Sequence, residues 1–473
     1  MQLFYISEED EEYRRANYQP PIREFTQQEL DIIDEQVTKY SEEAQKLREE
    51  TDRRSTSCIY KVLPRLKKIN GNSLYEPNMV SIGPYYYNLR NEKFKMAEDC
   101  KRKCLGSLLV KDRDPDMQRN TYKRCLQKIS ELEVKIRKCY SEEFEVAGIV
   151  FLEMMVLDAC FIIKIIEMVG SLRRVDFSES LAALEWMVPY FYRDFLLLEN
   201  QIPFFVLEEI YALTHNIAVE TSRSGLMVAA LRFFQNGMKR SDSILRFIIT
   251  NLDKIGTVTV LHLLDLVRSS LIPSNIRQGN RFRLDTPFIH CISKLRLAGI
   301  KVSPGKASSL LEVKFKRGVI KMPNIAIDDL MRCLLLNCVA FEQCHQMRSS
   351  KYYFTVYATF LDCLVNTSED VEYLRERNVI DNYLADDSEA ADFINRAGKD
   401  LVVNVNHGFY LQELFEDVEK HYQKWWMWKW ASFKRVYFDK PWLLLSAAGG
   451  ILLVLATSFQ AVMAFLTYKY KNC

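Results

Sequence analysis

The stretch FEVAGIVFLEMMVLDACFIIKIIEMVG, residues 144–170, decides the fold of this 473-residue chain. It is apolar but interrupted by charges, which is typical of a buried helix in a globular body rather than of a membrane span. At about 100° per residue, Glu153, Lys164 and Glu167 fall on one side of this helix, and Asp158 falls on the opposite, apolar side. A carboxylate inside a core must be paired, hydrogen-bonded or protonated. We therefore expect an arginine or backbone amides to hold Asp158, and the alternative is a catalytic carboxylate.

The stretch MVPYFYRDFLLLENQIPFFVLEEIYAL, residues 187–213, predicts two apolar helices divided at Pro203. The residue before a proline is pushed out of the α region, and proline itself suits a first helical turn. Glu199, Asn200 and Gln201 lie directly before this break. Such side chains either satisfy buried backbone groups at the two helix ends or line a ligand pocket. The candidate pocket residues are therefore Asp158, Glu199, Asn200, Gln201 and Pro203.

Upstream of the buried helix, prolines and glycines recur at short intervals in residues 58–90. They exclude long helices, so this part is expected to be a loop-rich platform with short strands around Met79 to Ile82. Residues 91–140 are basic and have helical spacing, which predicts one or two solvated helices.

Downstream, the sequence carries its best strand signal. Leu311, Val313 and Phe315 alternate with charged residues, and the chain then turns at Arg317-Gly318. This pattern predicts a small β-hairpin over 311–323.

Further helices surround this hairpin in the sequence. Residues 261–271 form one, in which Asp265 and Arg268 are three apart and can pair. Asp328 is placed to cap another that runs to about His345. Two more are expected at roughly 352–376 and 408–438.

The C-terminal stretch PWLLLSAAGGILLVLATSFQAVMAFLTY, residues 441–468, contains no charged side chain. Because about 20 apolar residues in a helix cross the bilayer core, it predicts one transmembrane helix, followed by a short tail at 469–473. Indole rings and long cationic side chains favour the headgroup layer. The candidate interface residues are Trp425, Trp426, Trp428, Trp430, Lys434, Arg435, Lys440 and Trp442.

More cations precede this helix than follow it, since only Lys469 and Lys471 lie beyond it. The positive-inside rule therefore places the body in the cytosol, although the sequence does not say at which membrane. The N-terminus MQLFYISEEDEE has neither a basic nor an apolar region of the kind a signal peptide needs. Reduced cysteines are the expectation for a body in that compartment.

Residues 1–57 form a charged N-terminal extension with one helix, which begins at a capping box of Thr26 and Glu29. Its apolar residues alternate at spacings of three and four, which draws a narrow heptad stripe. This stripe either docks on the chain's own body or binds a second copy. Its residues are Leu30, Ile33, Val37, Tyr40, Ala44 and Leu47.

Composition and motifs exclude several function classes. The net charge of +2 gives no electrostatic reason to expect nucleic acid as a partner. Cys100 and Cys104 supply two ligands, which is too few for a zinc site. The sequence Pro304-Gly305-Lys306 lacks the correctly spaced first glycine of a phosphate-binding loop. We therefore assign no catalytic residue, metal ligand or cofactor.

These patterns give a mainly α fold: a multi-helix globular body with a small β-hairpin, followed by one C-terminal transmembrane helix. The predicted parts are the extension at 1–57, the helical body at 58–440, the span at 441–468 and the tail.

Several of these stretches together resemble the plant family named domain of unknown function 247. The string Leu196-Leu197-Leu198-Glu199-Asn200-Gln201-Ile202-Pro203-Phe204-Phe205 is its most specific part. The resemblance covers nearly everything from Cys58 to the end. It also rests on Tyr75-x-Pro77, Val80-Ser81-Ile82-Gly83-Pro84-Tyr85, Leu263-Leu264-Asp265, Ala340-Phe341-Glu342-Gln343 and the C-terminal span.

The resemblance implies no enzymatic activity and no cofactor, and some grass relatives act in pollen-side self-incompatibility. Many relatives carry histidines where this chain has Tyr86 and Tyr87, so it implies no histidine-based site at that corner. The leading hypothesis is a single-pass membrane protein that acts as a non-enzymatic interaction, recognition or signalling module with unknown protein partners. The alternative is a membrane-tethered enzyme with a buried polar pocket around Asp158 and Glu199.

Overall fold

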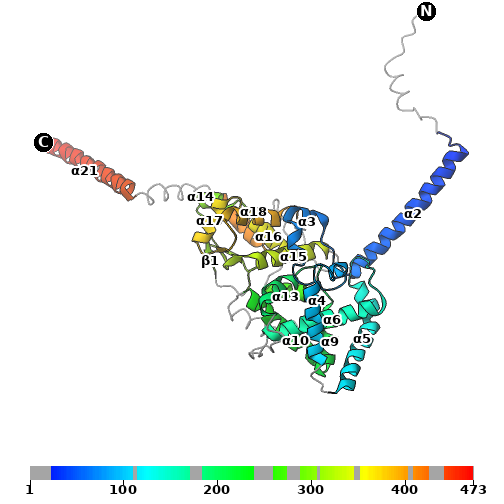
Figure 1. The fold of residues 1–473 in the computed structure, drawn as a ribbon. Coiled ribbons are helices and arrows are strands. Elements are labelled where there is room, and N and C mark those ends of the chain that lie inside the picture. Colours follow the sequence, from blue (N-terminus) through cyan, green and yellow to red (C-terminus); the bar gives the residue numbers. More distant parts are fainter. Residues whose placement is uncertain are drawn as a thin grey trace, which may run out of the picture. The chain divides into compact units, whose positions relative to one another are not determined.

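The computed structural model describes residues 23–109, 114–170, 184–238, 259–273, 288–305, 309–345, 352–402, 409–424 and 441–471. The chain divides into two units, Met1–Arg54 and Ser55–Cys473. Within the described residues the fold is mainly α, as the sequence predicts, with two small sheets (Figure 1).

The first unit contains most of helix α2, Gln27–Thr56. It begins at the predicted capping box, in which the backbone N–H of Thr26 donates to Glu29 Oε2 at 2.9 Å and the backbone N–H of Glu29 donates to Thr26 Oγ1 at 3.4 Å. The reciprocal bonds satisfy two backbone donors that the helix itself leaves unpaired.

Helix α6, Gly148–Gly170, is the centre of the first group of helices in the second unit. Because 14 of its 23 residues are buried, the prediction of a buried helix is confirmed. The charged side also agrees, since Glu153 is exposed and Lys164 and Glu167 are half-buried. The helix packs against α4 (Lys95–Leu109), α5 (Pro115–Lys138), α9 (Phe204–His215) and α10 (Val219–Gly237) (Figure 1).

A second group of helices is built around α15, Asp329–Cys344. Asp328 caps it as predicted, because its carboxylate accepts the Met331 backbone N–H at 2.8 Å. The group also contains α16 (Tyr353–Leu364), α17 (Ser368–Glu376) and α18 (Asp387–Gly398). Helix α15 also contacts α8 (Val188–Asp194) and α13 (Leu263–Leu271), which links the two groups into one body.

The predicted hairpin is confirmed as β2 (Lys314–Lys316) and β3 (Val319–Met322), paired antiparallel with Lys316 opposite Val319. A further strand, β1 (Lys301–Pro304), pairs parallel with β3 and completes a three-stranded sheet. A second sheet joins β4 (Ile325–Ile327) and β5 (Ile380–Asn382) in parallel. No sequence pattern predicted β1, β4 or β5, because β1 and the β4–β5 pair are joined to partners outside any local hairpin.

Short elements complete the body. They are α3 (Pro64–Asn70), α14 (Ile292–Leu297), α19 (Gln412–Tyr422) and the 3₁₀ turns η1 (Asn72–Leu74), η2 (Tyr87–Leu89) and η3 (Glu185–Met187). Helix α19 occupies part of the helix expected at 408–438, whose residues 425–438 lie outside the described ranges.

Two predicted boundaries are wrong. Helix α8 ends at Asp194, so residues 195–203 form a loop between the two helices rather than a break at Pro203 alone. The helix expected at 352–376 is two helices, because the Thr367 hydroxyl and the Asp370 carboxylate form a capping box that starts a new helix after a break at 365–367.

The strands expected around Met79 to Ile82 are also absent, and this described segment is neither helix nor strand. Its backbone groups are nevertheless bound, by side chains rather than by another strand.

Helix α21, Pro441–Lys471, contains a candidate membrane span at Ala448–Tyr468, in which none of the apolar 18-residue window is buried. Its exposed apolar side chains include Leu453 and Phe465, each 67% exposed. Length and composition therefore agree with the predicted single C-terminal helix.

Candidate functional site

Buried side chains bind most of the backbone of the segment 78–83, which we call the clamped segment. Asp194, at the end of α8, accepts the backbone N–H groups of Asn78 at 3.0 Å, Met79 at 2.7 Å and Val80 at 2.9 Å. A carboxylate has enough lone pairs for all three donors. Asp194 therefore takes the place of a neighbouring strand over half of the segment.

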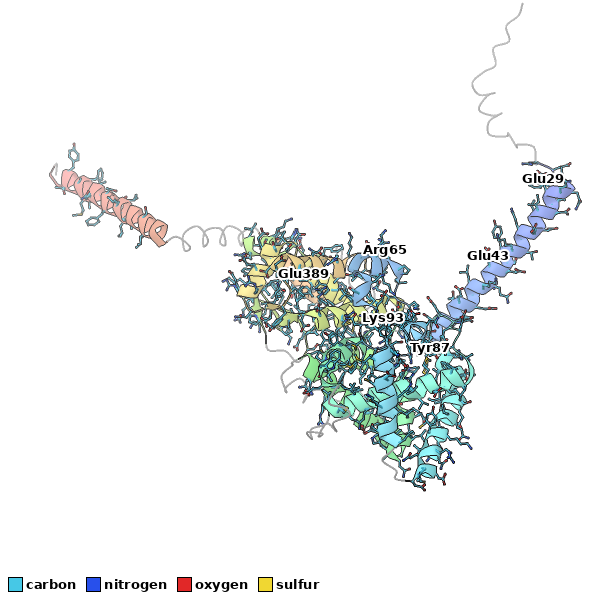
Figure 2. The ribbon with its side chains drawn as sticks, viewed as in Figure 1. Glu29, Glu43, Arg65, Tyr87, Lys93 and Glu389 are labelled. Carbon is cyan, nitrogen blue, oxygen red and sulfur yellow. The ribbon has the colours of Figure 1, made fainter. Side chains whose placement is uncertain are left out.

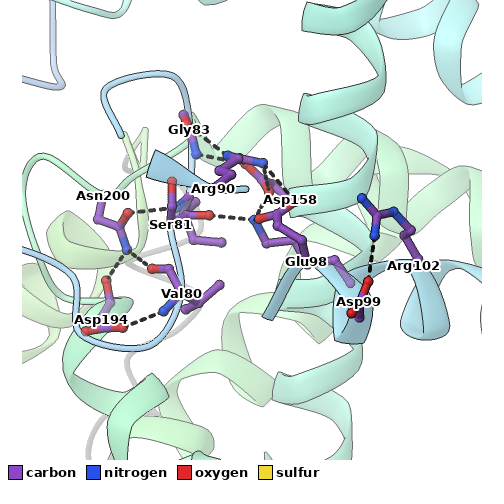
Figure 3. Close-up of polar contacts among 12 residues, drawn as sticks. Val80, Ser81, Gly83, Arg90, Glu98, Asp99, Arg102, Asp158, Asp194 and Asn200 are labelled. Atoms are coloured by element: carbon purple, nitrogen blue, oxygen red, sulfur yellow. Dashed lines mark hydrogen bonds and ion pairs between the residues drawn. The ribbon is translucent and has the colours of Figure 1, made fainter. Parts of the chain in front are cut away.

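Asn200 continues this pattern from the loop between α8 and α9 (Figure 3). Its Oδ1 accepts the Ile82 N–H at 2.7 Å, and its Nδ2 donates to the carbonyls of Val80 at 3.0 Å and Asp194 at 2.9 Å. The amide is thus bonded at both ends. A side-chain amide can bind both N–H and C=O groups of a backbone, as a neighbouring β-strand would.

Asp158 holds the end of the clamped segment. Its Oδ2 accepts the backbone N–H of Gly83 at 2.8 Å and Arg90 Nη2 at 2.6 Å, while its Oδ1 accepts Arg90 Nη1 at 3.1 Å. Arg90 Nη2 also donates to the Gly83 carbonyl at 2.9 Å. The side chain of Asp158 is fully buried, and it is paired with an arginine and a backbone amide, as its place on the apolar side requires.

Lys101 of α4 completes a buried cluster of four charges, two positive and two negative, whose other members are Arg90, Asp158 and Glu98. Its Nζ donates to the Ser81 carbonyl at 2.5 Å, to Glu98 Oε1 at 2.6 Å and to Asp158 Oδ1 at 2.7 Å. Three acceptors need three N–H bonds, which only the ammonium form supplies. The charges of Arg90, Lys101, Asp158 and Glu98 therefore sum to zero.

The pKa values in this cluster follow from burial and pairing. Burial alone would raise the pKa of Asp158, but Arg90 and Lys101 outweigh it and hold that pKa below its usual range. Burial lowers the pKa of Lys101, with repulsion from Arg90 as a further cause, and the two carboxylates oppose this shift. The hydrogen bonds decide in favour of the ionised pair, because a neutral Lys101 would leave one acceptor without its donor.

Glu199 binds a different part of the platform. Its Oε1 accepts the Val62 backbone N–H at 2.7 Å and lies 2.7 Å from Lys67 Nζ. Its Oε2 accepts the Tyr86 hydroxyl at 2.6 Å and lies 3.7 Å from Lys61 Nζ. Burial and the adjacent carboxylate raise the pKa of Tyr86, so the phenol remains a donor.

Gln201 and Pro203 shape the loop itself. Gln201 Nε2 donates to the carbonyls of Phe195 at 2.8 Å and Leu197 at 2.9 Å. Pro203 is the residue before α9, and the first N–H of that helix, from Phe204, donates to the Leu261 carbonyl at 2.8 Å. The described contacts of the loop residues support the first of the two predicted roles, the binding of buried backbone groups.

A buried histidine lies at the start of α13. His262 Nδ1 accepts the Asp265 backbone N–H at 3.2 Å, and its Nε2 lies 3.0 Å from the Cys58 carbonyl, to which it donates. Burial lowers the pKa of His262 to about 3. The neutral ring, with its proton on Nε2, fits both bonds, whereas a charged ring has no acceptor for Asp265. The predicted pair on this helix also forms, with Arg268 Nη1 3.8 Å from Asp265 Oδ1.

Arg90, Glu98, Lys101 and Asp194 were not predicted as site residues. A signal was present for Lys101, because it occupies the apolar stripe of α4 with Ala97, Cys104 and Leu108. Asp194 likewise stands inside an apolar stretch. Neither pattern identifies the backbone group that each charge binds.

Most of the candidate membrane-interface residues lie outside the described part of the chain. Trp442 is in α21. The others, Trp425, Trp426, Trp428, Trp430, Lys434, Arg435 and Lys440, lie outside the described residues. In the described part of the chain, no group of three or more His, Cys, Asp or Glu residues could hold a metal ion.

Comparison with known proteins supports a family assignment. A family model named DUF247, for plant proteins of unknown function, matches residues 59–456. The UPF0481 protein At3g47200 of Arabidopsis thaliana is 31% identical, over 88% of this chain and 87% of its own. The putative UPF0481 protein At3g02645 of the same plant is 24% identical, over 86% and 89% of the two chains. No solved structure matches the chain significantly. The chain belongs to the DUF247 family of plant proteins of unknown function.

Proposed function

We propose that this protein is a single-pass membrane protein whose helical body, in the cytosol, acts as a non-enzymatic interaction and recognition module. The exposed apolar helix α21 carries the proposal, because 21 residues at Ala448–Tyr468 match the thickness of a bilayer core. The contacts of Asp158 and Glu199 support a scaffold role, since both carboxylates bind backbone groups of the platform.

The test is extraction of the full-length protein from plant membranes. We expect it to resist alkaline carbonate and to dissolve in detergent, and we expect added protease to digest the body in sealed cytosol-side-out vesicles. Release by carbonate would overturn the anchor. Protection of the body from protease would overturn the orientation alone.

We also propose that the apolar stripe on α2 binds a second copy of the chain. Ile33 is half-buried, and the other side chains of the stripe are exposed, from 42% for Leu30 to 63% for Leu47. In the heptad, Leu30, Val37 and Ala44 occupy one core position, and Ile33, Tyr40 and Leu47 occupy the other.

The charges beside the stripe agree with a parallel pair. Glu43, labelled on α2 in Figure 2, precedes Arg48 by five residues, which is the spacing of an interhelical ion pair between the flanking positions. Glu29 and Asp34 have the same spacing and like charge, but Glu29 is already paired with Arg23, which lies just before the helix in the same chain. Anchored copies share one membrane, which raises their effective concentration.

Light scattering of the full-length protein in detergent tests this association. We expect a dimer that Val37→Glu converts to a monomer, because a charge enters the apolar stripe. Ile32→Glu is the matched control, since Ile32 is 54% exposed and lies outside the stripe. A monomeric wild type, or equal effects of the two substitutions, would contradict the proposal.

A further inference from the structure

Two cysteines far apart in the sequence, Cys58 and Cys139, are neighbours where the platform meets the end of α5. The Cys139 carbonyl accepts the backbone N–H of Cys58 at 2.8 Å and that of Ile59 at 2.8 Å. The next residues pair as a parallel β-bridge, Ile59 with Tyr140. Paired strands lie about 4.8 Å apart, and disulfides join Cα atoms separated by about 4.4 to 6.8 Å. The backbone at this point therefore already has the spacing that a disulfide needs.

The side chains face each other as well. The neighbouring Cys58 thiol is the main reason why the pKa of Cys139 lies below that of an ordinary thiol, with Lys135 as a further cause. The Cys139 thiol is in turn directed at the Lys135 carbonyl, 3.3 Å away. A thiol of lowered pKa is the more reactive partner in oxidation.

The two residues also differ in accessibility. Cys58 is buried, with 5% of its surface exposed, whereas Cys139 is half-buried. This combination of an accessible, acidic thiol and a sheltered neighbour is typical of cysteines that respond to oxidants.

We propose that Cys58 and Cys139 form a reversible disulfide, with Cys139 as the attacking thiol and Cys58 as the resolving thiol. The proposal is independent of the membrane anchor and of self-association.

The oxidant is a peroxide. The Cys139 thiolate attacks one peroxide oxygen, the O–O bond breaks, and Cys139 becomes a sulfenic acid while the other oxygen leaves as water after protonation. The Cys58 sulfur then attacks the Cys139 sulfur, the S–O bond breaks, and a second water leaves. In total, two thiols and one hydrogen peroxide give one disulfide and two waters. A dithiol reverses the reaction.

The disulfide would close a loop that contains the clamped segment, Arg90 and Lys101. It would fix the start of the body to the end of α5 and restrict the unfolded chain. The oxidised body is therefore expected to melt at a higher temperature than the reduced one.

The experiment uses the full-length protein in detergent, treated with a small excess of hydrogen peroxide. We expect a product two hydrogens lighter, a tryptic peptide pair joined through Cys58 and Cys139, and a melting temperature raised by roughly 5 °C. Dithiothreitol should reverse all three changes. Cys139→Ser should abolish them, and Cys100→Ser, also at a half-buried cysteine, should leave them intact.

Other products decide against the proposal. Sulfinic acid on Cys139 while Cys58 can still be alkylated would overturn it, as would a disulfide between any other two cysteines. A joined peptide pair in Cys139→Ser would show that the assignment is wrong. Because Cys139 is half-buried, its substitution is expected to preserve folding, which circular dichroism checks.

Discussion

At the scale of single residues, Gly83 has a backbone that almost no other residue could adopt in this place. Its φ angle is +70°, and an added Cβ would lie 2.5 Å from the Gln201 carbonyl oxygen. Gly83→Ala should therefore add both left-handed strain, about 1–2 kcal/mol, and a clash with backbone that cannot move easily. We expect a loss of about 3 kcal/mol or more in the free energy of unfolding, measured by denaturant titration.

Gly148→Ala is the matched control. Its φ angle is +58°, but nothing lies within 4 Å of an added Cβ. It should lose only the strain, about 1–2 kcal/mol. Equal losses at the two positions would show that the contact between the added Cβ and the Gln201 carbonyl does not affect the free energy of unfolding.

His262 should make stability depend on pH. Its pKa is about 3 in the folded protein and 6.5 as the ordinary value, so between these values only the unfolded chain binds the proton. Its contribution is complete above pH 6.5 and is lost as pH falls toward 3. Between pH 7 and pH 5 the loss amounts to about 2 kcal/mol.

His262→Asn keeps an acceptor for the Asp265 N–H but cannot titrate. Denaturant titrations at pH 7 and pH 5 should show a smaller difference for this variant than for the wild type, whatever its absolute stability. An unchanged difference would mean that the ring is protonated in the folded state.

At the scale of residues, the sequence shows which side chains must be paired, but it does not show which residues pair with them. The periodicity of residues 144–170 shows that Asp158 is buried and must be paired, and the structure confirms this. It cannot show that Arg90 and Lys101 are the partners, because they lie 68 and 57 residues away along the chain. The packing of α4 against α6 brings Lys101 to Asp158, and Arg90 reaches it from the end of η2.

At the scale of elements, the hairpin turn offers a direct test. Arg317 and Gly318 have φ angles of +53° and +78°, so both central residues of this two-residue turn are left-handed, as a type I′ turn requires. A left-handed backbone costs free energy at arginine, whereas asparagine adopts it more readily. Arg317→Asn should raise the stability by about 0.5–1 kcal/mol, seen as a higher melting temperature.

Arg377→Asn is not an equivalent change, because Arg377 has a negative φ angle of −89°. It therefore controls for the loss of one positive charge. If both variants shift the melting temperature equally, the effect belongs to charge and not to the turn.

Elements with strong local signals were predicted well. The hairpin, the Asp328 cap and the α2 capping box each depend on residues within a few positions of one another. The prediction of strand at 79–82 is wrong, and it rested on a segment that includes the β-favouring residues Val80 and Ile82. What replaces the second strand is a set of side chains from α6, α8 and the loop after α8, which no local pattern reveals.

At the scale of the whole molecule, the proposed membrane insertion of the chain depends on α21. Leu455 and Phe459 are four residues apart, near the middle of the candidate span, and lysine at the centre of a membrane helix costs about 2.5–3.5 kcal/mol. Leu455→Lys combined with Phe459→Lys should therefore weaken insertion by about 5–7 kcal/mol. We expect carbonate to release this variant from membranes.

The control places the same two charges near the ends of the helix, as Ser446→Lys with Tyr468→Lys. There the lysine side chains reach the headgroup layer, so this variant should stay in the membrane fraction. Release of both variants, or of neither, would contradict insertion of α21 across the bilayer.

The clamped segment has a consequence for how the body fluctuates. Amide hydrogens normally exchange slowest inside helices and central strands. Here the N–H groups of Val80, Ile82 and Gly83 are locked to Asp194, Asn200 and Asp158, so no single helix can fray and free them all. In deuterated water, some of the last protons to be replaced should therefore belong to a stretch with no regular secondary structure.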